Sequence, residues 1–304
     1  MYSTYFNTTI FYRHLHSALT PGGDSLKSVN TLTVASWNVN SITVRLAQVI
    51  DWLNVHRPDV LCLQETKIPD ERFPKAAIEA VGYQVVYSGQ KAYNGVAILS
   101  RLPISQVRSS LPGDDETAQK RLIAATIAGI EVVNVYVPNG SEVGSEKFAY
   151  KLAWLERLYR WFERDFDPQG AVLLCGDFNI APEARDVYDA QAVAGKVLFH
   201  PDEHAALARL QQWGLIDTLR IHTEEAGLFS WWDYRAAAFR RNLGMRIDQI
   251  WVSAPLAARC TAGWIDRQMR AADSPSDHVP VVASFEIDSE ARDPGGSVLE
   301  LESR

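Results

Sequence analysis

Short, uniformly apolar runs constrain this fold more than any other feature of the sequence. Val60–Leu63 and Ala171–Cys175 contain no charged or amide side chain. Runs of this length and composition are typical of strands that are buried on both faces. Each run stops at a polar group that contains a carboxylate, Glu65 after the first and Asp177 after the second. Such strands need other layers of structure to cover them.

Amphipathic segments between these runs predict the covering helices. Within Val44–His56, apolar residues at Leu46, Val49 and Leu53 fall on one helix face. Two more helices are expected over Glu146–Phe166 and Ala205–Trp213. Further strands are expected at Leu32–Val39, Tyr83–Tyr87, Gly95–Leu99, Ile123–Ile127, Val132–Val137, Arg246–Ser253 and Val279–Ile287. Because helices and strands interleave, the predicted class is α/β or α+β, with packed sheets covered by helices.

The chain length and the limits of the apolar pattern predict one domain. A chain of 304 residues with 47% hydrophobic residues can bury one large core. Strand-like alternation begins at Leu32, and the composition turns to Glu, Asp, Gly and Ser after Ile287. We therefore expect a disordered extension at 1–30, one domain over 31–288, and a disordered acidic tail at 289–304.

Charge and cysteine content exclude several classes of protein. A formal net charge of -7 argues against a protein that coats DNA by bulk electrostatics, so any nucleic-acid surface must be local. Three cysteines are an odd number, and two of them lie in apolar runs, which indicates reduced thiols. No apolar run reaches the length of a membrane span, and the N-terminus lacks the apolar core of a secretory signal. We expect a cytoplasmic protein without membrane association.

Compact polar groups follow several of the predicted strands. They are Trp37-Asn38, Gln64-Glu65, Val137–Asn139, Gly176–Asn179, Arg246–Asp248 and Ser276–His278. Side chains from separate strand ends commonly converge on one ligand site. Carboxylates, carboxamides and one histidine without cysteine favour a hard cation such as Mg²⁺ or Mn²⁺ over Zn²⁺. A hard metal indicates phosphate chemistry.

Each motif taken alone also has a structural explanation. Asn38 and Asp248 at strand ends are individually more typical of turns or caps, and a single histidine is usually structural. The Gly176–Asn179 motif is more specific, because glycine lets the backbone turn after a buried strand and leaves two polar side chains beside each other. His278 next to Asp277, and within reach of a second aspartate, suits a histidine oriented by a carboxylate. It is the combination of motifs that favours a catalytic site.

The ordered motifs resemble those of the bacterial exonuclease III family, within the endonuclease/exonuclease/phosphatase superfamily. The resemblance covers about Leu32 to Ile287 and rests on Trp37–Asn40, Leu63–Lys67, Gly113–Glu116, Val135–Gly140, Gly176–Ile180, Trp213–Thr218, Phe229–Arg235, Arg246–Asp248 and Ser276–His278. It implies two packed mixed sheets flanked by helices, a four-layer sandwich. It also implies that 31–288 is a catalytic domain.

The same resemblance implies the site residues. The metal site would involve Asn38, Glu65, Asp177, Asn179, Asp277 and His278. Glu65 resembles the principal ligand, and Asp177 the residue that positions or deprotonates the attacking water. Asn179 and Tyr136 resemble phosphate contacts, and His278, held by Asp248, a group that stabilises developing charge. Whether Asp177 or His278 is the base stays open.

The implied activity is that of a monomeric DNA-repair nuclease that uses Mg²⁺, with Mn²⁺ as a substitute. It would act on duplex DNA as a 3′-to-5′ exonuclease and as an endonuclease 5′ to abasic sites, with 3′-phosphatase or 3′-phosphodiesterase activity besides. Candidate DNA contacts are Arg121, Lys147, Trp231, Trp232, Arg235, Arg240 and Arg241. The two tryptophans would line a pocket for a flipped abasic residue, although at least one is expected to be core. The loop 141–148, which contains Lys147, differs from the family pattern in length and composition, so its DNA contacts stay open.

Two other functions remain open at this point. The first is a phosphatase or phosphodiesterase of the same superfamily that acts on a substrate other than DNA, which the metal residues alone do not exclude. The aromatic segment Phe229–Arg235 favours DNA. The second is a catalytically inactive module that binds DNA or a partner, which the complete set of catalytic side chains disfavours.

Overall fold

The computed structural model describes residues 29–288. The extension and tail expected at the two ends lie outside the described residues, except for Val29 and Asn30, which belong to the first strand, β1 (Val29–Asn38). Strand β1 therefore begins two residues before the expected boundary. Apolar alternation starts only at Leu32, so the sequence pattern gave no sign of these two strand residues.

Two six-stranded sheets form the centre of the molecule. The first has the order β11-β12-β1-β2-β4-β3 and contains β2 (Val60–Gln64), β3 (Gln84–Ser88), β4 (Val96–Ser100), β11 (Cys260–Ile265) and β12 (Val281–Asp288). The second has the order β5-β6-β7-β8-β10-β9 and contains β5 (Ile104–Arg108), β6 (Leu122–Ile127), β7 (Ile130–Tyr136), β8 (Val172–Asp177), β9 (Leu215–Asp217) and β10 (Asp248–Ser253). Pairs β1–β2 and β7–β8 are parallel and the other pairs are antiparallel, so both sheets are mixed.

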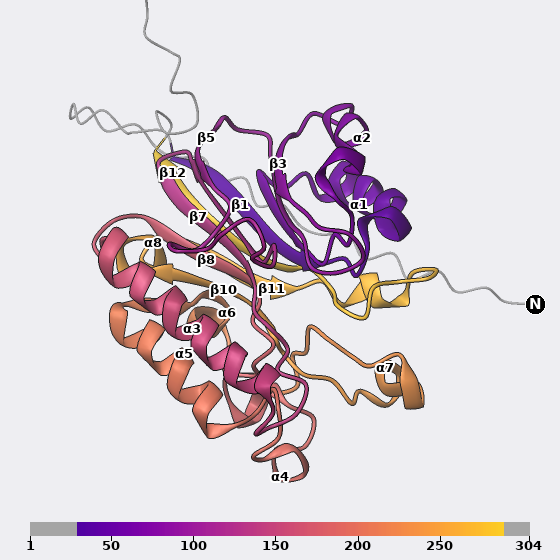
Figure 1. Cartoon of the computed structure of the whole chain (residues 1–304). Helices are drawn as coiled ribbons and strands as arrows, with labels where there is room; N and C mark the ends of the chain where they lie inside the picture. The colour runs from indigo at the N-terminus through magenta and orange to yellow at the C-terminus, as the bar shows by residue number, and fades with distance from the viewer. Residues whose placement is uncertain (1–28, 289–304) are drawn as a thin grey trace, which may run out of the picture.

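Helices cover the outer faces of both sheets, as Figure 1 shows. Helices α1 (Ile42–His56) and α2 (Lys75–Glu79) lie over the first sheet, and α3 (Glu146–Asp165) and α5 (Pro201–Trp213) lie over the second. The shorter helices are α4 (Ala190–Val193), α6 (Thr218–His222), α7 (Ala238–Arg241) and α8 (Ala254–Ala257), of which α4 and α7 lie on loops beyond the strands. Helix α1 packs Trp52 and Leu53 on the first sheet, and α3 packs Trp154 and Leu158 on the second. The predicted four-layer sandwich is confirmed.

Besides the two apolar layers under the helices, another apolar layer lies between the two sheets and joins them to each other. Val34 and Cys62 of the first sheet pack in one buried cluster with Leu173, Cys175 and Ile250 of the second. Strands in the middle of the sandwich are therefore covered on both faces, which explains their uniformly apolar sequences. Of the helices within residues 29–288, none has both the length and the apolar composition needed to cross a membrane.

Candidate active site

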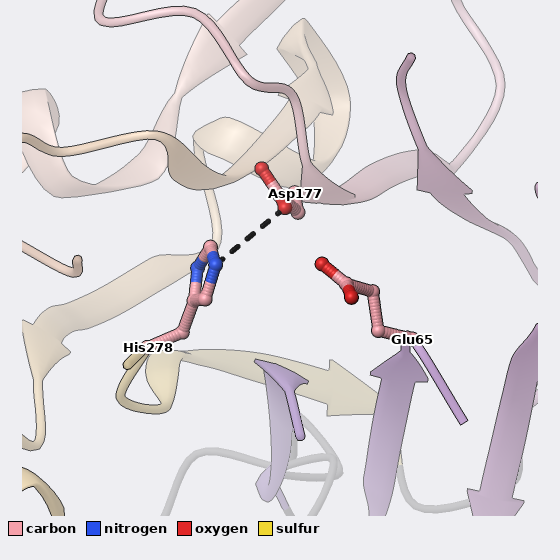
Figure 2. Close-up of side chains that lie close together, drawn as sticks. All are labelled: Glu65, Asp177 and His278. Atoms are coloured by element: carbon pink, nitrogen blue, oxygen red, sulfur yellow. Dashed lines mark ion pairs between the residues drawn. The ribbon is translucent and has the colours of Figure 1, made fainter. Parts of the chain in front are cut away.

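The two parallel strand pairs carry the site residues to one edge of the sandwich. Asn38 at the end of β1 lies opposite Gln64 at the end of β2, so Glu65 emerges beside it. In the second sheet Tyr136 lies opposite Asp177 at the ends of β7 and β8. Parallel neighbours end at the same edge, and the two sheets face each other, so side chains from both meet. Figure 2 shows Glu65 and Asp177 pointing toward one another from different strands.

Glu65, Asp177 and His278 form the tightest cluster of potential metal ligands within residues 29–288. Each offers one ligand atom, and these atoms lie within 4.8 Å of one another. Asp177 and His278 are buried, whereas Glu65 is partly exposed. Two carboxylates with no sulfur nearby suit a hard divalent cation that keeps some of its water. The donor set therefore fits the ion that the sequence predicts.

Asn38 spaces the two carboxylates of this cluster. Its Nδ2 atom donates to Oε1 of Glu65 and to Oδ2 of Asp177, each at 2.9 Å. Its Oδ1 atom accepts from the backbone N–H of Asn40 at 3.0 Å. The carboxamide oxygen that would ligate a metal is thus turned to the backbone. In this geometry the Asn38 amide holds the carboxylates of Glu65 and Asp177 next to each other.

Lys67 and Asn40 link Glu65 to Asp277. The ammonium of Lys67 lies 2.6 Å from Glu65 Oε2 and 2.5 Å from the Oδ1 of Asn40. Asn40 in turn donates to Asp277 Oδ1 at 2.8 Å. Burial disfavours the charge of Glu65, but Lys67 and Asn38 together hold its pKa below the usual value. Asp277 is therefore joined to the cluster of Glu65, Asp177 and His278 through two side chains.

His278 is held by Asp248, as the resemblance implies. Its Nδ1 atom lies 2.8 Å from Asp248 Oδ2, which also accepts from the hydroxyl of Ser230 at 2.7 Å. The other ring nitrogen, Nε2, faces Asp177 Oδ2 at 3.8 Å. Burial opposes protonation of the ring, but Asp248 and Asp177 outweigh it and raise the pKa of His278 to about 10. The ring is therefore an imidazolium at neutral pH.

The buried carboxyl group of Asp177 is shifted toward its uncharged form. Burial raises the pKa of its carboxyl to about 7; His278 opposes this shift, while Asp248 and Glu65 add to it. The backbone N–H of Asn179 donates to Oδ1 at 2.8 Å and fixes the carboxylate plane. Gly176 just before it has a φ of +143°, and a Cβ there would lie 1.9 Å from the carbonyl oxygen of Val135. Glycine is required because β7 and β8 approach so closely.

Asn179 forms a carboxamide pair with Asn139. Asn139 Nδ2 donates to Asn179 Oδ1 at 2.9 Å, and Asn179 Nδ2 donates to the carbonyl of Val137 at 3.0 Å. Tyr136 lies at the end of β7 beside this pair, and burial raises the pKa of its hydroxyl far above the usual value, with Glu65 adding to the shift. The hydroxyl therefore stays protonated and can donate a hydrogen bond. Asn179 and Tyr136 are thus positioned to contact an anionic group.

The structure adds residues that the sequence reasoning did not assign. Asn40, Lys67 and Asn139 lie within the quoted motifs, two or three residues from an assigned position, so their signal was present but unused. Ser230 also lies in a quoted motif, next to Trp231, but its bond to Asp248 joins segments 18 residues apart, and the sequence does not show this contact.

The expected DNA contacts fall into two groups. Arg121 and Lys147 line an open cavity of about 320 Å³, together with Asn139 and the exposed rings of Tyr93 and Tyr150. The guanidinium of Arg121 lies over the ring of Tyr136, 4.7 Å from its centroid. Through Tyr136, this first group of residues lies next to the cluster of Glu65, Asp177 and His278.

The second group of expected DNA contacts consists of the two tryptophans, Trp231 and Trp232, and the three arginines that follow them in the sequence. The Nε1 atom of Trp231 donates to Asp277 Oδ2 at 3.0 Å, and its ring centroid lies 6.4 Å from that of His278. Trp232 is fully buried and packs against Phe229 and Phe239. It cannot line a pocket for DNA, which corrects its assignment. Arg235, Arg240 and Arg241 are exposed, and Arg235 pairs with its neighbour Asp233.

Comparisons with known proteins agree with this geometry. The model of the endonuclease/exonuclease/phosphatase family matches residues 35–278. Exodeoxyribonuclease III of Haemophilus influenzae is 37% identical over 262 residues, which cover 82% of this chain and 98% of the relative. An AP endonuclease structure from Archaeoglobus fulgidus is 43% identical with a TM-score of 0.81 and covers 84% of this chain and 100% of its own. A 3′ phosphatase from Neisseria, bound to a product DNA hairpin, has the same identity and TM-score over 84% and 99% of the chains.

Proposed function

The chain belongs to the endonuclease/exonuclease/phosphatase family and is a DNA-repair nuclease, and we propose that it cleaves duplex DNA at 3′ ends and on the 5′ side of abasic residues. The single observation that carries this proposal is the cluster of Glu65, Asp177 and His278 within 4.8 Å. The similarity to an exodeoxyribonuclease III and to an AP endonuclease supports the two activities. The catalytic domain is proposed to span 31–288 and to act as a monomer, since the cluster is complete in one chain.

Glu65 is the proposed principal ligand of a divalent cation, Mg²⁺ in the first instance and Mn²⁺ as a substitute. Its carboxylate is partly exposed, and Asp177 faces it across the cluster. A bound cation supplies positive charge that stabilises phosphoryl oxygens. Lys67 holds Oε2 of Glu65 on the other side, so only part of the carboxylate is available to the ion.

The side chains around the cluster divide the chemical work. Asp177, with a pKa raised to about 7, orients the attacking water and can accept its proton near neutral pH. His278, protonated and fixed by Asp248, donates to a phosphoryl oxygen as negative charge develops. Asn179 and Tyr136 hold the scissile phosphate by neutral hydrogen bonds. The buried aspartate and the buried imidazolium thus have different protonation states at the same pH.

DNA is proposed to bind over the surface next to the cluster. Arg121 and Lys147 supply phosphate contacts on one side, and Arg235 on the other. Trp231 alone remains as a ring that can border an abasic sugar. Because the net charge is -7, binding depends on these few local cations. Three free cysteines fit a reducing compartment, and the proposed location is the cytoplasm, on chromosomal DNA.

A 3′-phosphatase activity is a second candidate, favoured by the Neisseria 3′ phosphatase. The same cluster serves both reactions, because each is attack of water on a phosphoryl group. In both reactions a 3′ oxygen leaves; the phosphorus carries a second ester to a 5′ oxygen in the nuclease reaction and no second ester in the phosphatase reaction.

Three labelled duplexes test these proposals together. One carries an internal abasic analogue, one a recessed 3′ hydroxyl end, and one a 3′ phosphate. We expect cleavage of the first two with Mg²⁺ or Mn²⁺, and none in excess chelator. Release of phosphate from the third duplex supports the phosphatase activity. Hydrolysis of inositol phosphates or sphingolipids with all three duplexes left intact would contradict the assignment to DNA.

A further inference from the structure

A lysine occupies a core position on helix α3. Apolar residues at Phe148, Leu155, Leu158 and Phe162 mark the buried face of this helix, and Lys151 falls on it at the same three- and four-residue spacing. The side chain of Lys151 is 0% exposed. An ammonium in such a place is strongly disfavoured unless all of its donors are satisfied.

Three acceptors satisfy this ammonium. Lys151 Nζ donates to the backbone carbonyls of Asn179 at 2.6 Å and of Asn139 at 3.1 Å, and it pairs with the carboxylate of Glu203. Glu203 lies on α5 and is also 0% exposed. Its oxygens accept from the backbone N–H groups of Leu198 at 3.2 Å and His200 at 3.0 Å. Helices α3 and α5 are thereby joined to both loops that carry the carboxamide pair.

The two anchored carbonyls belong to the two residues whose side chains bond to each other. Asn139 and Asn179 are paired at 2.9 Å, and Asn179 Nδ2 also reaches Asp177 Oδ2 at 3.3 Å. Asn179 adopts a left-handed backbone with φ of 49°. The loop also packs on the stem of Lys151, since a Cβ on Gly140 would lie 3.1 Å from its Cδ. The ammonium of Lys151 therefore holds the backbone of both Asn139 and Asn179 in place.

We propose that Lys151 and Glu203 are positioning residues that set the Asn139–Asn179 carboxamides for the attack on the phosphate. This inference rests on the proposed function, because it assigns Asn179 to the scissile phosphate. Buried ion pairs can often be replaced by apolar residues of similar volume without loss of stability. What an apolar pair cannot supply is a donor to the carbonyls of Asn139 and Asn179. The pair therefore contributes geometry rather than stability.

The test variant is Lys151→Met/Glu203→Gln, which keeps the volume of both side chains and leaves no buried charge unpaired. The matched control is Arg209→Met/Glu156→Gln. Arg209 and Glu156 form an ion pair between the same two helices, but both side chains are 38% exposed. The control removes the same kind of link between α3 and α5 without touching either asparagine loop.

Single-turnover cleavage of the abasic duplex and equilibrium binding of that duplex are measured for each variant. Because a misplacement of about 1 Å can cost ~10²-fold in rate, the test variant is expected to cleave about 10–100-fold more slowly. Binding should change by no more than about 2-fold, since phosphate contacts made elsewhere dominate affinity. In an Asn179→Ala background the same change should cost no further rate, because residues that act through one another are not additive.

A cleavage rate equal to that of the control, or a loss that multiplies with that of Asn179→Ala, overturns the proposal. If the double variant does not fold, Lys151→Gln/Glu203→Gln replaces it, because this pair also leaves no buried charge unpaired; its smaller expected loss must also vanish in the Asn179→Ala background. The side-chain amide NMR signals of Asn139 and Asn179 give a readout independent of activity. They should shift in the test variant and stay in place in the control; unshifted signals overturn the proposal. A wild-type protein that cleaves no duplex refutes the nuclease function, whereas these signals still decide the positioning.

Discussion

The Nε2 atom of His278 and the Oδ2 atom of Asp177 lie 3.8 Å apart, too far for a hydrogen bond between them. Both atoms face the carboxylate of Glu65 within 4.8 Å. The imidazolium and the aspartate are therefore not hydrogen-bonded to each other. In the proposed reaction, a proton would pass between them through a group that contacts both, such as water or a phosphoryl oxygen.

Asp177→Asn is expected to lower single-turnover cleavage while DNA binding survives. The change keeps the size of the side chain but removes the group that accepts the proton of the attacking water. General-base assistance is typically worth about 10²–10⁴-fold, so at least this loss is expected. Binding should hold or tighten, because a negative charge near the phosphate is removed. If cleavage and binding fall together, Asp177 serves only the structure.

Glu65→Gln is expected to weaken metal binding more than any neighbouring change. Removal of residues that merely orient metal ligands costs roughly 10–100-fold in affinity, and a ligand should cost at least as much. Calorimetric titration with Mn²⁺ measures the affinity without DNA. Glu163→Gln on the exposed side of α3 is the control. Equal Mn²⁺ affinity in Glu65→Gln and wild type would show that Glu65 does not hold the ion.

Asp248→Asn is expected to lower the pKa of His278 from about 10 toward its ordinary 6.5 in the metal-free protein. A histidine whose pKa is raised by folding stabilises the folded state below pH 6.5, and this contribution is lost as the pH rises through 10. Wild type should therefore lose stability between pH 7 and 10, and the variant should lose less. Imidazole ¹⁵N NMR gives the pKa, and urea unfolding at the two pH values gives the stability. An unchanged imidazole titration would remove Asp248 as its cause.

Trp232→Ala and Trp231→Ala are expected to act on different properties. Trp232 is fully buried, and removal of such a ring typically costs about 3–5 kcal/mol of unfolding free energy. Trp231 is only partly buried, so its removal should cost less stability and more cleavage of the abasic duplex. Urea unfolding and the ratio of abasic to 3′-end cleavage separate the two. A Trp232→Ala protein of full stability would place that ring outside the core.

Arg235→Ala is expected to weaken DNA binding in a salt-dependent way. The side chain is 88% exposed and its local partner Asp233 lies on the same loop, so the guanidinium is free to reach a phosphate. Loss of one phosphate contact should reduce the slope of log affinity against log salt by about 1. Arg160→Ala, an equally cationic but distant change on α3, should leave the slope unaltered. Identical slopes for both variants would show that Arg235 makes no phosphate contact.

The central strands and the long helices could be predicted from the sequence because burial gives them a simple pattern. The predicted helix over Glu146–Phe166 corresponds to α3 at Glu146–Asp165. Strands β5, β9 and β11 were not predicted. All three lie at sheet edges, and β5 exposes most of its side chains, so its sequence shows neither an apolar run nor a clear alternation. Such edge strands form because they pair with a neighbouring strand, and this pairing leaves no pattern in the local sequence.

The sequence predicts which residues form the site but not which of their atoms contact one another. Glu65, Asp177 and His278 were assigned from motifs, and the fold brings them together. The roles of Asn38 and Asp277 depend on which atom each side chain presents, and that is set by contacts across the sandwich. Lys151 was overlooked because a lysine on a helix usually faces water. Its place in the apolar spacing of α3 was the available signal.

All strands of the second sheet lie within one continuous stretch of chain, Ile104–Ser253. In the first sheet, β12 pairs with β1 but follows that stretch in the sequence. His278 lies three residues before that strand. During synthesis, Glu65 and Asp177 therefore leave the ribosome well before the histidine that completes the cluster. A nascent chain that stops before residue 278 has two members of the cluster and lacks the third.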